Sequence, residues 1–413
     1  MNVLFVHQNF PGQFKFLAPA LARRGHRVVA LSMRQQGGGA GNGVRIIGYW
    51  PTRSIAPSLH PWLRDLETKV VRAEACLRRA MQLKAEGYTP DVIIAHPGWG
   101  ESMFLKDLWP RARLGIYCEY FYQATGGDVG FDSEFPSDAL DTACRLRIKN
   151  LNNHLHFDVA DAGLSPTHWQ ASTFPEPFRR KITVAHDGIE TTALAPEPTA
   201  SFALADGRFL NRNNEVITFV SRNLEPYRGY HIFMRSLPQI LASRPAAIVL
   251  IVGGDGVSYG PKPSGDRSWM RVFADEVRES MPTACWDRIH FLGKLPFQDY
   301  VSVLRISSVH VYLTYPFVLS WSLLEAMSLE CAIVASDTPP VREALVDRET
   351  GRLVDFFDVD GFVDTICCLL DDRQERTRLG KAAREVAVSR YDLATSCLPQ
   401  QLAWVNSLHD DRA

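Results

Sequence analysis

The stretch Thr314-Tyr-Pro-Phe-Val-Leu-Ser-Trp-Ser-Leu-Leu-Glu-Ala-Met327 determines how the rest of the chain is interpreted. The apolar run at 309–313 precedes it and predicts a buried strand. From Trp321 onward, apolar side chains recur at helical spacing around one carboxylate, that of Glu325, which predicts an amphipathic helix. A buried strand, a loop and a helix in this order are typical of a parallel α/β fold.

The same alternation of strand and helix extends through both halves of the chain. In the second half we predict strands at 216–221, 247–252, 289–292, 309–313 and 332–335. In the first half we predict strands at 3–6, 27–31, 91–95, 114–118, 162–165 and 182–185. Strands separated by helices imply right-handed crossovers and parallel sheets. The sequence therefore predicts an α/β protein with two doubly wound, Rossmann-like domains that face each other across an inter-domain cleft.

The domain boundaries follow from an interruption of this alternation. Between about 193 and 214, prolines, Gly207 and a run of polar residues replace the periodic pattern, so we predict a linker there. The first domain is then 1–192, the second is 215–390, and 391–413 is a helical tail that can pack back on the first domain.

Composition excludes several classes of protein. The chain has 413 residues, a hydrophobic content of 46% and a charged content of 22%, which are typical of a globular enzyme of two domains. The formal net charge of −1 argues against a general nucleic-acid surface. The eight cysteines are scattered without a Cys-x-x-Cys pair, which indicates reduced thiols in a cytoplasmic protein.

The sequence gives no sign of a membrane-spanning segment or a signal peptide. The start lacks a basic region and reads as a first strand, and no apolar run is long enough to span a bilayer. The helix predicted at about 61–86 carries several Lys and Arg residues, which we interpret as a solvated face. Peripheral docking of this helix on anionic lipid at the inner face of the plasma membrane is the alternative.

Polar and glycine residues follow one predicted strand after another. Ligands of open α/β sheets bind beyond the carboxyl ends of the strands, so these residues predict a ligand cleft. The segments concerned begin at Asn9, His96, Glu119, Arg222, Gly253, Gly293 and Tyr315.

Two arginines stand out at one of these strand ends. Arg222 ends the strand predicted at 216–221, and Arg228 follows six residues later at a helix start. Fixed cations stabilise the charge that develops on a leaving diphosphate, and a helix N-terminus adds its dipole. Taken alone, the pair is better explained as surface arginines near a turn, but together with the stretch at 314–327 it leads us to predict that both arginines act on a nucleoside diphosphate.

The stretch at 314–327 resembles the signature of the retaining nucleotide-sugar glycosyltransferases of family 4, and nearly the whole chain looks like a bacterial branch of that family. The resemblance implies that Glu325 binds the donor's ribose, and that Arg228 stands at the family's Lys position. Backbone groups of the loop with Ser320, Trp321 and Ser322 would meet phosphate and sugar, and Gly293 and Lys294 join the donor-binding set. One departure is Phe317, because the family usually has a second Glu eight positions before the helix Glu.

The first half carries further parts of the resemblance. Phe10-Pro-Gly-Gln13 resembles the family's glycine loop, which implies that Gly12 and Gln13 approach the diphosphate. His96 matches the His that contacts the donor sugar. We assign Glu119 and Asp128 to the acceptor side.

The resemblance implies a GT-B fold and a metal-independent, retaining transfer of a hexose from a nucleoside-diphosphate sugar, preferably a UDP-sugar, to an unknown acceptor. No cofactor and no metal are expected. Two alternatives stay open. The first is a sugar phosphorylase or a hydrolysing nucleotide-sugar epimerase on the same fold. The second is a non-catalytic nucleotide-sugar-binding subunit, which is motivated by Phe317.

Overall fold

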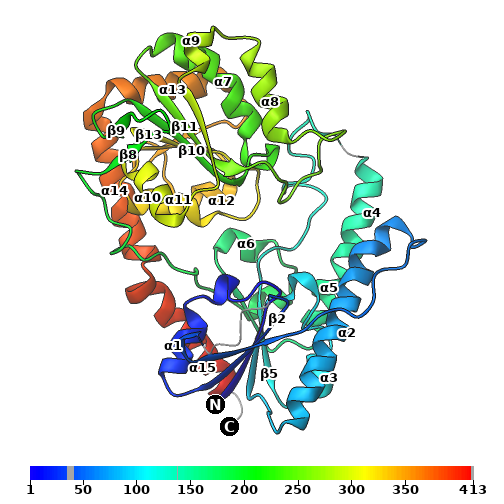
Figure 1. The fold of residues 1–413 in the computed structure, drawn as a ribbon. Coiled ribbons are helices and arrows are strands. Elements are labelled where there is room, and N and C mark those ends of the chain that lie inside the picture. The colour runs from blue at the N-terminus through cyan, green and yellow to red at the C-terminus, as the bar shows by residue number, and fades with distance from the viewer. Residues whose placement is uncertain (35–40, 137, 411–413) are drawn as a thin grey trace. The chain divides into compact units, whose positions relative to one another are not determined.

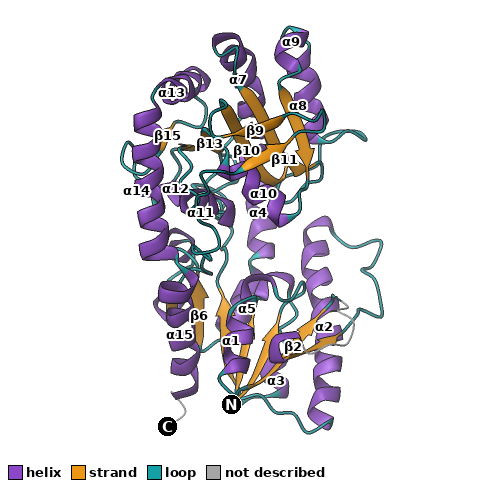
Figure 2. Cartoon of the chain, turned by 60° about the vertical axis from the view of Figure 1, so that its left-hand side comes forward, coloured by secondary structure: helices purple, strands orange, loops and turns teal. Residues whose placement is uncertain are grey.

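The computed structural model describes residues 1–34, 41–136 and 138–410. The chain divides into two compact units. Unit 1 comprises Met1–Gly188 and the C-terminal segment from Leu393, and unit 2 is Ile189–Asp392. Figure 1 shows the course of the chain, and Figure 2 shows that helices flank the strands in each unit.

Unit 1 is built on a parallel sheet in the order β3-β2-β1-β4-β5-β6-β7. Alternate residues of the central strand β1 enter two different apolar cores, as the two-residue period of a strand requires. The strands are β1 (Asn2–Val6), β2 (Arg27–Ser32), β3 (Val44–Gly48), β4 (Val92–Ala95), β5 (Arg113–Tyr117), β6 (Ala162–Ser165) and β7 (Ile182–Val184).

Helices cover both faces of this sheet. They are α1 (Leu17–Arg23), α2 (Arg64–Ala85), α3 (Leu105–Leu108), α4 (Ala139–Lys149), α5 (Leu151–Phe157), α6 (His168–Ser172) and the C-terminal α15 (Leu398–Asp410). Buried side chains of α1 and α15 share one core with Val3 and Phe5, whereas buried side chains of α2 and α3 share the other with Leu4 and Val6. In Figure 1 the red helix α15 lies beside α1.

Close packing of α15 depends on a glycine in β5. A Cβ atom on Gly115 would stand 2.6 Å from the indole of Trp404 and 2.7 Å from a methyl group of Leu408. Both side chains are buried. The C-terminal segment is therefore part of the core of unit 1, although the whole of unit 2 separates it from the rest of that unit in the sequence.

Unit 2 repeats the plan of unit 1 with a parallel sheet in the order β12-β11-β10-β13-β14-β15. Its strands are β10 (Val216–Asn223), β11 (Ile248–Gly254), β12 (Ile289–Gly293), β13 (Val309–Tyr312), β14 (Ile333–Ser336) and β15 (Arg352–Val354). Its helices are α7 (Tyr230–Ser243), α8 (Trp269–Arg278), α9 (Thr283–Trp286), α10 (Phe297–Arg305), α11 (Trp321–Ser328), α12 (Pro339–Arg342), α13 (Val359–Asp371) and α14 (Arg373–Tyr391). The core on one face includes residues of α10, α11 and α14.

The segment predicted as a linker at 193–214 differs from that expectation. It belongs to unit 2 and contains a two-stranded antiparallel hairpin, β8 (Ser201–Ala203) and β9 (Phe209–Asn211). Leu204 and Leu210 of this hairpin are buried against β10, β11 and α10. The turn residues that suggested a linker therefore connect two short strands, whose few apolar residues were too short a signal to predict them.

None of the helices in the described residues combines the length and the apolar character that crossing a membrane requires.

Candidate functional site

Both sheets reverse their strand order at one point, and most of the predicted site residues follow the strands on either side of it; Glu119 and Asp128 instead follow β5, and Gly293 and Lys294 lie at the end of β12. In unit 1 the reversal lies between β1 and β4, and in unit 2 between β10 and β13. Ligands of doubly wound folds bind at the carboxyl ends of the strands that meet at such a point. The loops after these four strands are therefore the candidate sites of the two units.

In unit 2, Arg228 holds the loop after β13. Its side chain is buried, and Nη1 donates to Oγ1 of Thr314 at 2.8 Å and to the carbonyl oxygen of Val318 at 3.1 Å. The guanidinium also lies 5.1 Å from the ring centroid of Tyr259. Arg228 therefore joins the loops that follow β10, β11 and β13, and part of its donor capacity is used within the protein.

Arg222 stands in a different environment from Arg228. It is exposed at the end of β10, next to the buried Asn223. Lys294, which follows β12, extends toward the same strand end. A Cβ atom on Gly254 would stand 2.4 Å from Cε of Lys294 and 2.8 Å from Oδ1 of Asn223. The absence of a side chain at Gly254 thus lets a second cation approach the end of β10, and Gly293 turns the chain there with a positive φ of 65°.

The loop that opens α11 satisfies part of its own backbone. The backbone N–H of Ser320 donates to the hydroxyl of Tyr312 at 2.9 Å, and that of Ser322 donates to Oγ of Ser320 at 3.3 Å. Ser320 is thus the N-cap of α11. This corrects the expectation that these two N–H groups meet phosphate and sugar. The hydroxyls of Ser320 and Ser322, 2.9 Å apart, and the 40% exposed Trp321 complete the loop surface.

Glu325 is held by a residue of another helix. Its carboxylate is half-buried in α11, and Oε2 accepts a hydrogen bond of 2.5 Å from the hydroxyl of Tyr300 in α10. Burial and the neighbouring Glu325 carboxylate raise the pKa of Tyr300, so the phenol keeps its proton and remains a donor. Tyr300 therefore fixes the orientation of the predicted ribose-binding carboxylate.

Phe317, at the position where the family usually has Glu, belongs to an aromatic cluster. Its ring centroid lies 5.8 Å from that of Tyr227 and 5.0 Å from that of Tyr259. Tyr227 is also 4.8 Å from Tyr315. Only 6% of Phe317 is exposed, so the side chain packs inside the loop. Apolar packing therefore takes the place of the contact between a carboxylate and the donor sugar that is usual in the family at this position.

In unit 1, His7, Gly12 and Gln13 form one compact group after β1. Nδ1 of His7 accepts the backbone N–H of Asn9 at 3.0 Å, so Nε2 carries the proton and donates to Oε1 of Gln13 at 2.8 Å. A Cβ atom on Gly12 would stand 2.3 Å from this Nε2. Burial, with a smaller contribution from His96, lowers the pKa of His7 to about 3, so the ring is neutral.

Glu119 connects this group to His96, which follows β4. Its Oε1 accepts from Nε2 of Gln13 at 3.3 Å, and its Oε2 lies 3.5 Å from Nε2 of His96. Nδ1 of His96 accepts the backbone N–H of Gly98 at 3.2 Å, which leaves the proton on the nitrogen that faces Glu119. The structure therefore brings Gly12, Gln13, His96 and Glu119 together, with His7, into what we call the His7–His96 network.

Asp128 lies in other contacts. It is buried, and Oδ1 accepts from the hydroxyl of Tyr120 at 2.9 Å. Asp128 therefore does not line the pocket described below, but it holds Tyr120, whose side chain does.

Three further residues, His7, Glu225 and Tyr300, hold the site together without a role predicted from the sequence. The buried carboxylate of Glu225 accepts the backbone N–H groups of Ser258 and Tyr259 at 3.1 and 3.2 Å, and so connects the loops after β10 and β11. Its place between Arg222 and Arg228 was the available signal. For His7 the available signal was its position at the end of the first strand. Tyr300 gave no local signal, because its partner is 25 residues away.

Two family models match the chain. The model described as "Glycosyl transferase family 4 group" matches residues 24–194, and "Glycosyl transferases group 1" matches residues 205–386. Relatives include the phosphatidyl-myo-inositol mannosyltransferase of Mycolicibacterium smegmatis, 31% identical over 50% of this chain and 47% of that protein. The D-inositol 3-phosphate glycosyltransferase of Corynebacterium glutamicum is 26% identical over 79% of this chain and 74% of its own length. The chain thus spans about half the length of the first of these relatives.

Solved structures share the fold along the whole chain. The Anabaena HepE complex with UDP and glucose has a TM-score of 0.67 and 16% identity, with 98% of this chain and 99% of that chain covered. Sucrose-phosphate synthase from Thermosynechococcus elongatus has a TM-score of 0.72 and 16% identity, with both chains covered completely. Two Rossmann-like units with these neighbours define a protein of the GT-B fold. The two family models show that the chain belongs to glycosyltransferase family 4.

Proposed function

We propose that this protein is a retaining, metal-independent glycosyltransferase that moves a hexose from a nucleoside-diphosphate sugar to an acceptor. UDP is the preferred nucleotide. The observation that carries the proposal is the set of residues after β10, β12 and β13 in unit 2, where two cations, Arg222 and Lys294, approach one strand end near the loop that opens α11. Cations fixed at one edge of a sheet stabilise the charge on a departing diphosphate.

On this proposal Arg222 and Lys294 contact the diphosphate directly. Arg228 contributes its charge from a buried position, and it also holds the loop at Thr314 and Val318 in place for the donor. Glu325 accepts hydrogen bonds from the ribose hydroxyls, with its orientation fixed by Tyr300. The hydroxyls of Ser320 and Ser322 and the indole of Trp321 complete the donor site.

Residues of unit 1 take the sugar and the acceptor. His96 donates from Nε2 to the donor sugar, and Gly12 and Gln13 approach the diphosphate. Glu119 keeps His96 in the required tautomer, because its carboxylate faces the protonated nitrogen. In a retaining, front-face reaction the leaving diphosphate itself takes the acceptor's proton, which explains why no general base has to be assigned.

The relatives support the transfer of a hexose, since the M. smegmatis relative is a mannosyltransferase. The solved HepE structures in complex with UDP and glucose, and with UDP-glucose, support UDP as the nucleotide. A cytoplasmic location, with peripheral contact to the plasma membrane as the alternative, stays a prediction.

Donor binding tests the proposal. We expect UDP at a hundredfold excess over its dissociation constant to stabilise the protein by about 2.7 kcal/mol, which a thermal shift measures. Arg222→Ala should remove most of this shift, because it removes an exposed cation from the end of β10. Arg271→Ala is the matched control, since Arg271 is an exposed arginine of α8 in the same unit. The absence of a shift with UDP-, GDP-, dTDP- and ADP-sugars would contradict the proposal.

A second candidate function is nucleotide-sugar binding without catalysis. The aromatic packing of Phe317 favours it, because the family's usual sugar-binding carboxylate is missing. Incubation of the wild-type protein with a bound donor and a broad pool of acceptors separates the two candidates. Turnover supports the transferase, whereas binding without turnover supports the second candidate. Rapid hydrolysis or epimerisation of the donor without an acceptor would instead favour a sugar phosphorylase or a hydrolysing nucleotide-sugar epimerase.

A further inference from the structure

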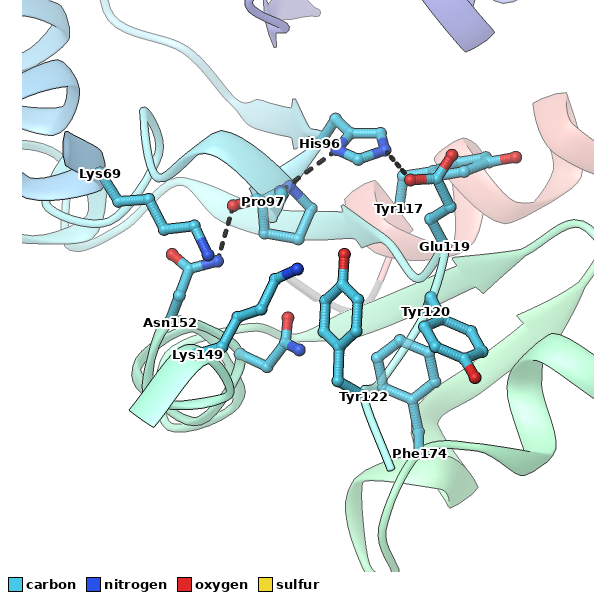
Figure 3. Close-up of a pocket in the computed structure, with 12 residues that line it drawn as sticks. Lys69, His96, Pro97, Tyr117, Glu119, Tyr120, Tyr122, Lys149, Asn152 and Phe174 are labelled. Atoms are coloured by element: carbon cyan, nitrogen blue, oxygen red, sulfur yellow. Dashed lines mark hydrogen bonds and ion pairs between the residues drawn. The ribbon is translucent and has the colours of Figure 1, made fainter. Parts of the chain in front are cut away.

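Unit 1 contains a pocket beside the His7–His96 network, and this pocket is unusual because two cationic side chains line it. The pocket extends from the loop after β4 to the helices α2, α4 and α5, as Figure 3 shows. Two lysines from different helices line it, together with amide and aromatic side chains. The residues that matter below are Lys69, Lys149, Asn152, Tyr122, His96 and Glu119.

Lys69 is buried in spite of its charge. The sequence predicts a solvated face for the basic residues of the helix at about 61–86, but only 5% of Lys69 is exposed, so the prediction is wrong for this residue. Its Nζ forms an ion pair of 2.8 Å with Asp65, one turn earlier in α2. A Cβ atom on Gly100 would stand 2.8 Å from the carbonyl oxygen of Lys69, so the loop after β4 packs directly on this turn of α2. Burial of an ammonium group is costly unless it is paired, and Asp65 supplies one partner while the group still lines the pocket.

Lys149 brings a second cation from the last residue of α4. Its ammonium lies 3.5 Å from the ring centroid of Tyr122, and within the described part of the chain it forms no ion pair. In Figure 3 the ammonium of Lys149 and the hydroxyl of Tyr122 point toward the side of the pocket that Pro97 and His96 form. Burial lowers the pKa of Lys149 to about 8, so it still carries its charge at neutral pH.

Asn152 adds an unsatisfied acceptor to the pocket wall. Its Nδ2 donates to the carbonyl oxygen of Pro97 at 2.8 Å, whereas the buried Oδ1 has no hydrogen-bond partner among the described residues. Only 2% of Asn152 is exposed. A buried acceptor without a partner is costly unless a ligand or a water donates to it. The pocket therefore offers cations for an oxyanion and an acceptor for a hydroxyl group.

We propose that this pocket binds the acceptor, and that Lys69 and Lys149 hold a phosphate or carboxylate group that the acceptor carries. A hydroxyl of the same molecule donates to Oδ1 of Asn152, which makes the acceptor an anionic polyhydroxyl compound, such as a phosphorylated or acidic sugar. Since His96 and Glu119 also line the pocket, an oxyanion fixed at the lysines places the rest of the acceptor beside the residues assigned to the donor sugar. The assignment of this ligand as the acceptor rests on the proposed function, but the oxyanion site itself does not depend on it.

Oxyanion binding at Lys149 can be measured without knowing the acceptor. We would titrate sodium phosphate and sodium acetate against sodium chloride at equal ionic strength, with the donor site saturated by UDP, and follow thermal unfolding. At least one oxyanion should stabilise the wild-type protein and Lys149→Arg. In Lys149→Gln its dissociation constant should rise about tenfold or more, because a hydrogen bond to a charged group is lost. Lys381→Gln, which changes an exposed lysine of α14, should behave as the wild type.

Two results would overturn the oxyanion site. One is that neither oxyanion stabilises the wild-type protein more than chloride, and the other is that Lys149→Gln binds the oxyanion as tightly as the wild type. The UDP shift of Lys149→Gln should equal that of the wild type, which also shows that the variant is folded. Should UDP itself fail to bind, the proposed function fails. The oxyanion titration can then be repeated without UDP on Arg222→Ala, which lacks the cation proposed to contact the diphosphate. Its result still tests the oxyanion site.

Turnover tests whether the molecule bound in this pocket is the acceptor. Once an acceptor pool supports transfer, anionic acceptors should be used in preference to their neutral counterparts. Lys149→Gln should raise the KM for the acceptor and leave the KM for the donor unchanged. Equal use of neutral acceptors would show that the pocket does not select the acceptor.

Discussion

The two units share one sheet topology but differ in what stands at the point where the strand order reverses. In unit 1 the His7–His96 network occupies this point. The neutral ring of His7 contacts the amide of Gln13, and this amide contacts the carboxylate of Glu119, which faces His96. In unit 2 the same point carries the cations Arg222 and Arg228, and Lys294 approaches it across Gly254. The fold thus provides the same position twice, and the side chains after each strand decide which chemistry is possible there.

Unit 2 itself contains two kinds of arginine at this point. Arg228 is buried and holds three loops together, whereas Arg222 is exposed at a strand end. A residue that organises a site and a residue that contacts a ligand can therefore stand six positions apart. The following predictions test this distinction and the contrast between the units, and among the substitutions the largest expected effect comes first.

We expect Arg228→Ala to lower the free energy of unfolding by about 3 kcal/mol or more, because it leaves Thr314 and the carbonyl of Val318 without their donor and opens a cavity. Urea denaturation measures the change. Arg222→Ala should change stability by less than about 0.5 kcal/mol, since its side chain is exposed. Similar losses for both variants would remove the distinction between the two arginines.

Gly12→Ala should destabilise unit 1 by about 2–3 kcal/mol. The residue has a positive φ of 47°, and the added Cβ atom would stand 2.3 Å from Nε2 of His7, so the ring must move away from Gln13. Gly25→Ala is the matched control, because Gly25 also has a positive φ, of 83°, but no heavy atom lies within 4 Å of the added Cβ. The control should lose only about 1 kcal/mol from backbone strain. Equal losses in thermal denaturation would show that contact with His7 is unimportant.

Acid should destabilise unit 1 more steeply than unit 2. Burial lowers the pKa values of His7 to about 3, His156 to about 4 and His186 to about 4 in unit 1, whereas in unit 2 it lowers that of His310 to about 3. Each of these histidines binds a proton below about pH 6.5 only when the chain is unfolded. Their contribution is therefore complete above pH 6.5 and is lost as the pH falls toward the folded-state pKa.

The loss is about 1.4 kcal/mol per pH unit and per histidine between these limits. Hydrogen exchange followed by mass spectrometry at pH 7 and pH 5, corrected for the intrinsic exchange rate, should show a larger loss of protection in unit 1. A larger loss in unit 2 would contradict the assignment of these rings as buried and neutral.

A small effect is expected for Glu119→Gln. Its contacts with Gln13 and His96 are 3.3 and 3.5 Å long, and 40% of the side chain is exposed, so stability should fall by less than about 1 kcal/mol. Removal of the carboxylate should also lower the pKa of His7 further, because the charge of Glu119 favours the protonated ring. Ring titration by NMR measures this shift. An unchanged pKa of His7 would show that Glu119 does not act on the network.

The sequence predicted the central strands of both sheets because each is a continuous apolar run buried on two faces. It missed β3 and β15, which lie at sheet edges. Arg45 is exposed within β3, and β15 has three residues, of which Val354 alone is buried. A partly exposed edge strand of this length has neither a long apolar run nor a clear alternation, so periodicity cannot separate it from a loop.

For the candidate site, the sequence predicted which loops carry polar residues but not how their side chains pair. The contact of Tyr300 with Glu325 depends on the packing of α10 against α11, and that of Gln13 with Glu119 spans 106 residues. Lys69 shows the same limit, because its spacing along α2 gives no sign that the loop at Gly100 covers it. Such pairings are set by tertiary packing, which local patterns do not contain.

The place of α15 in unit 1 has a consequence for how the protein can be divided. Unit 2 is inserted between two parts of unit 1, and its first and last residues are neighbours, because Ile189 donates its backbone N–H to Tyr391 at 2.8 Å and bridges to Asp392. An insert with adjacent ends can be excised and produced alone. A fragment that stops at residue 188 would instead expose the apolar surface that Leu402, Trp404 and Val405 cover, so it should aggregate unless the missing helix is supplied as a peptide or fused through a short tether.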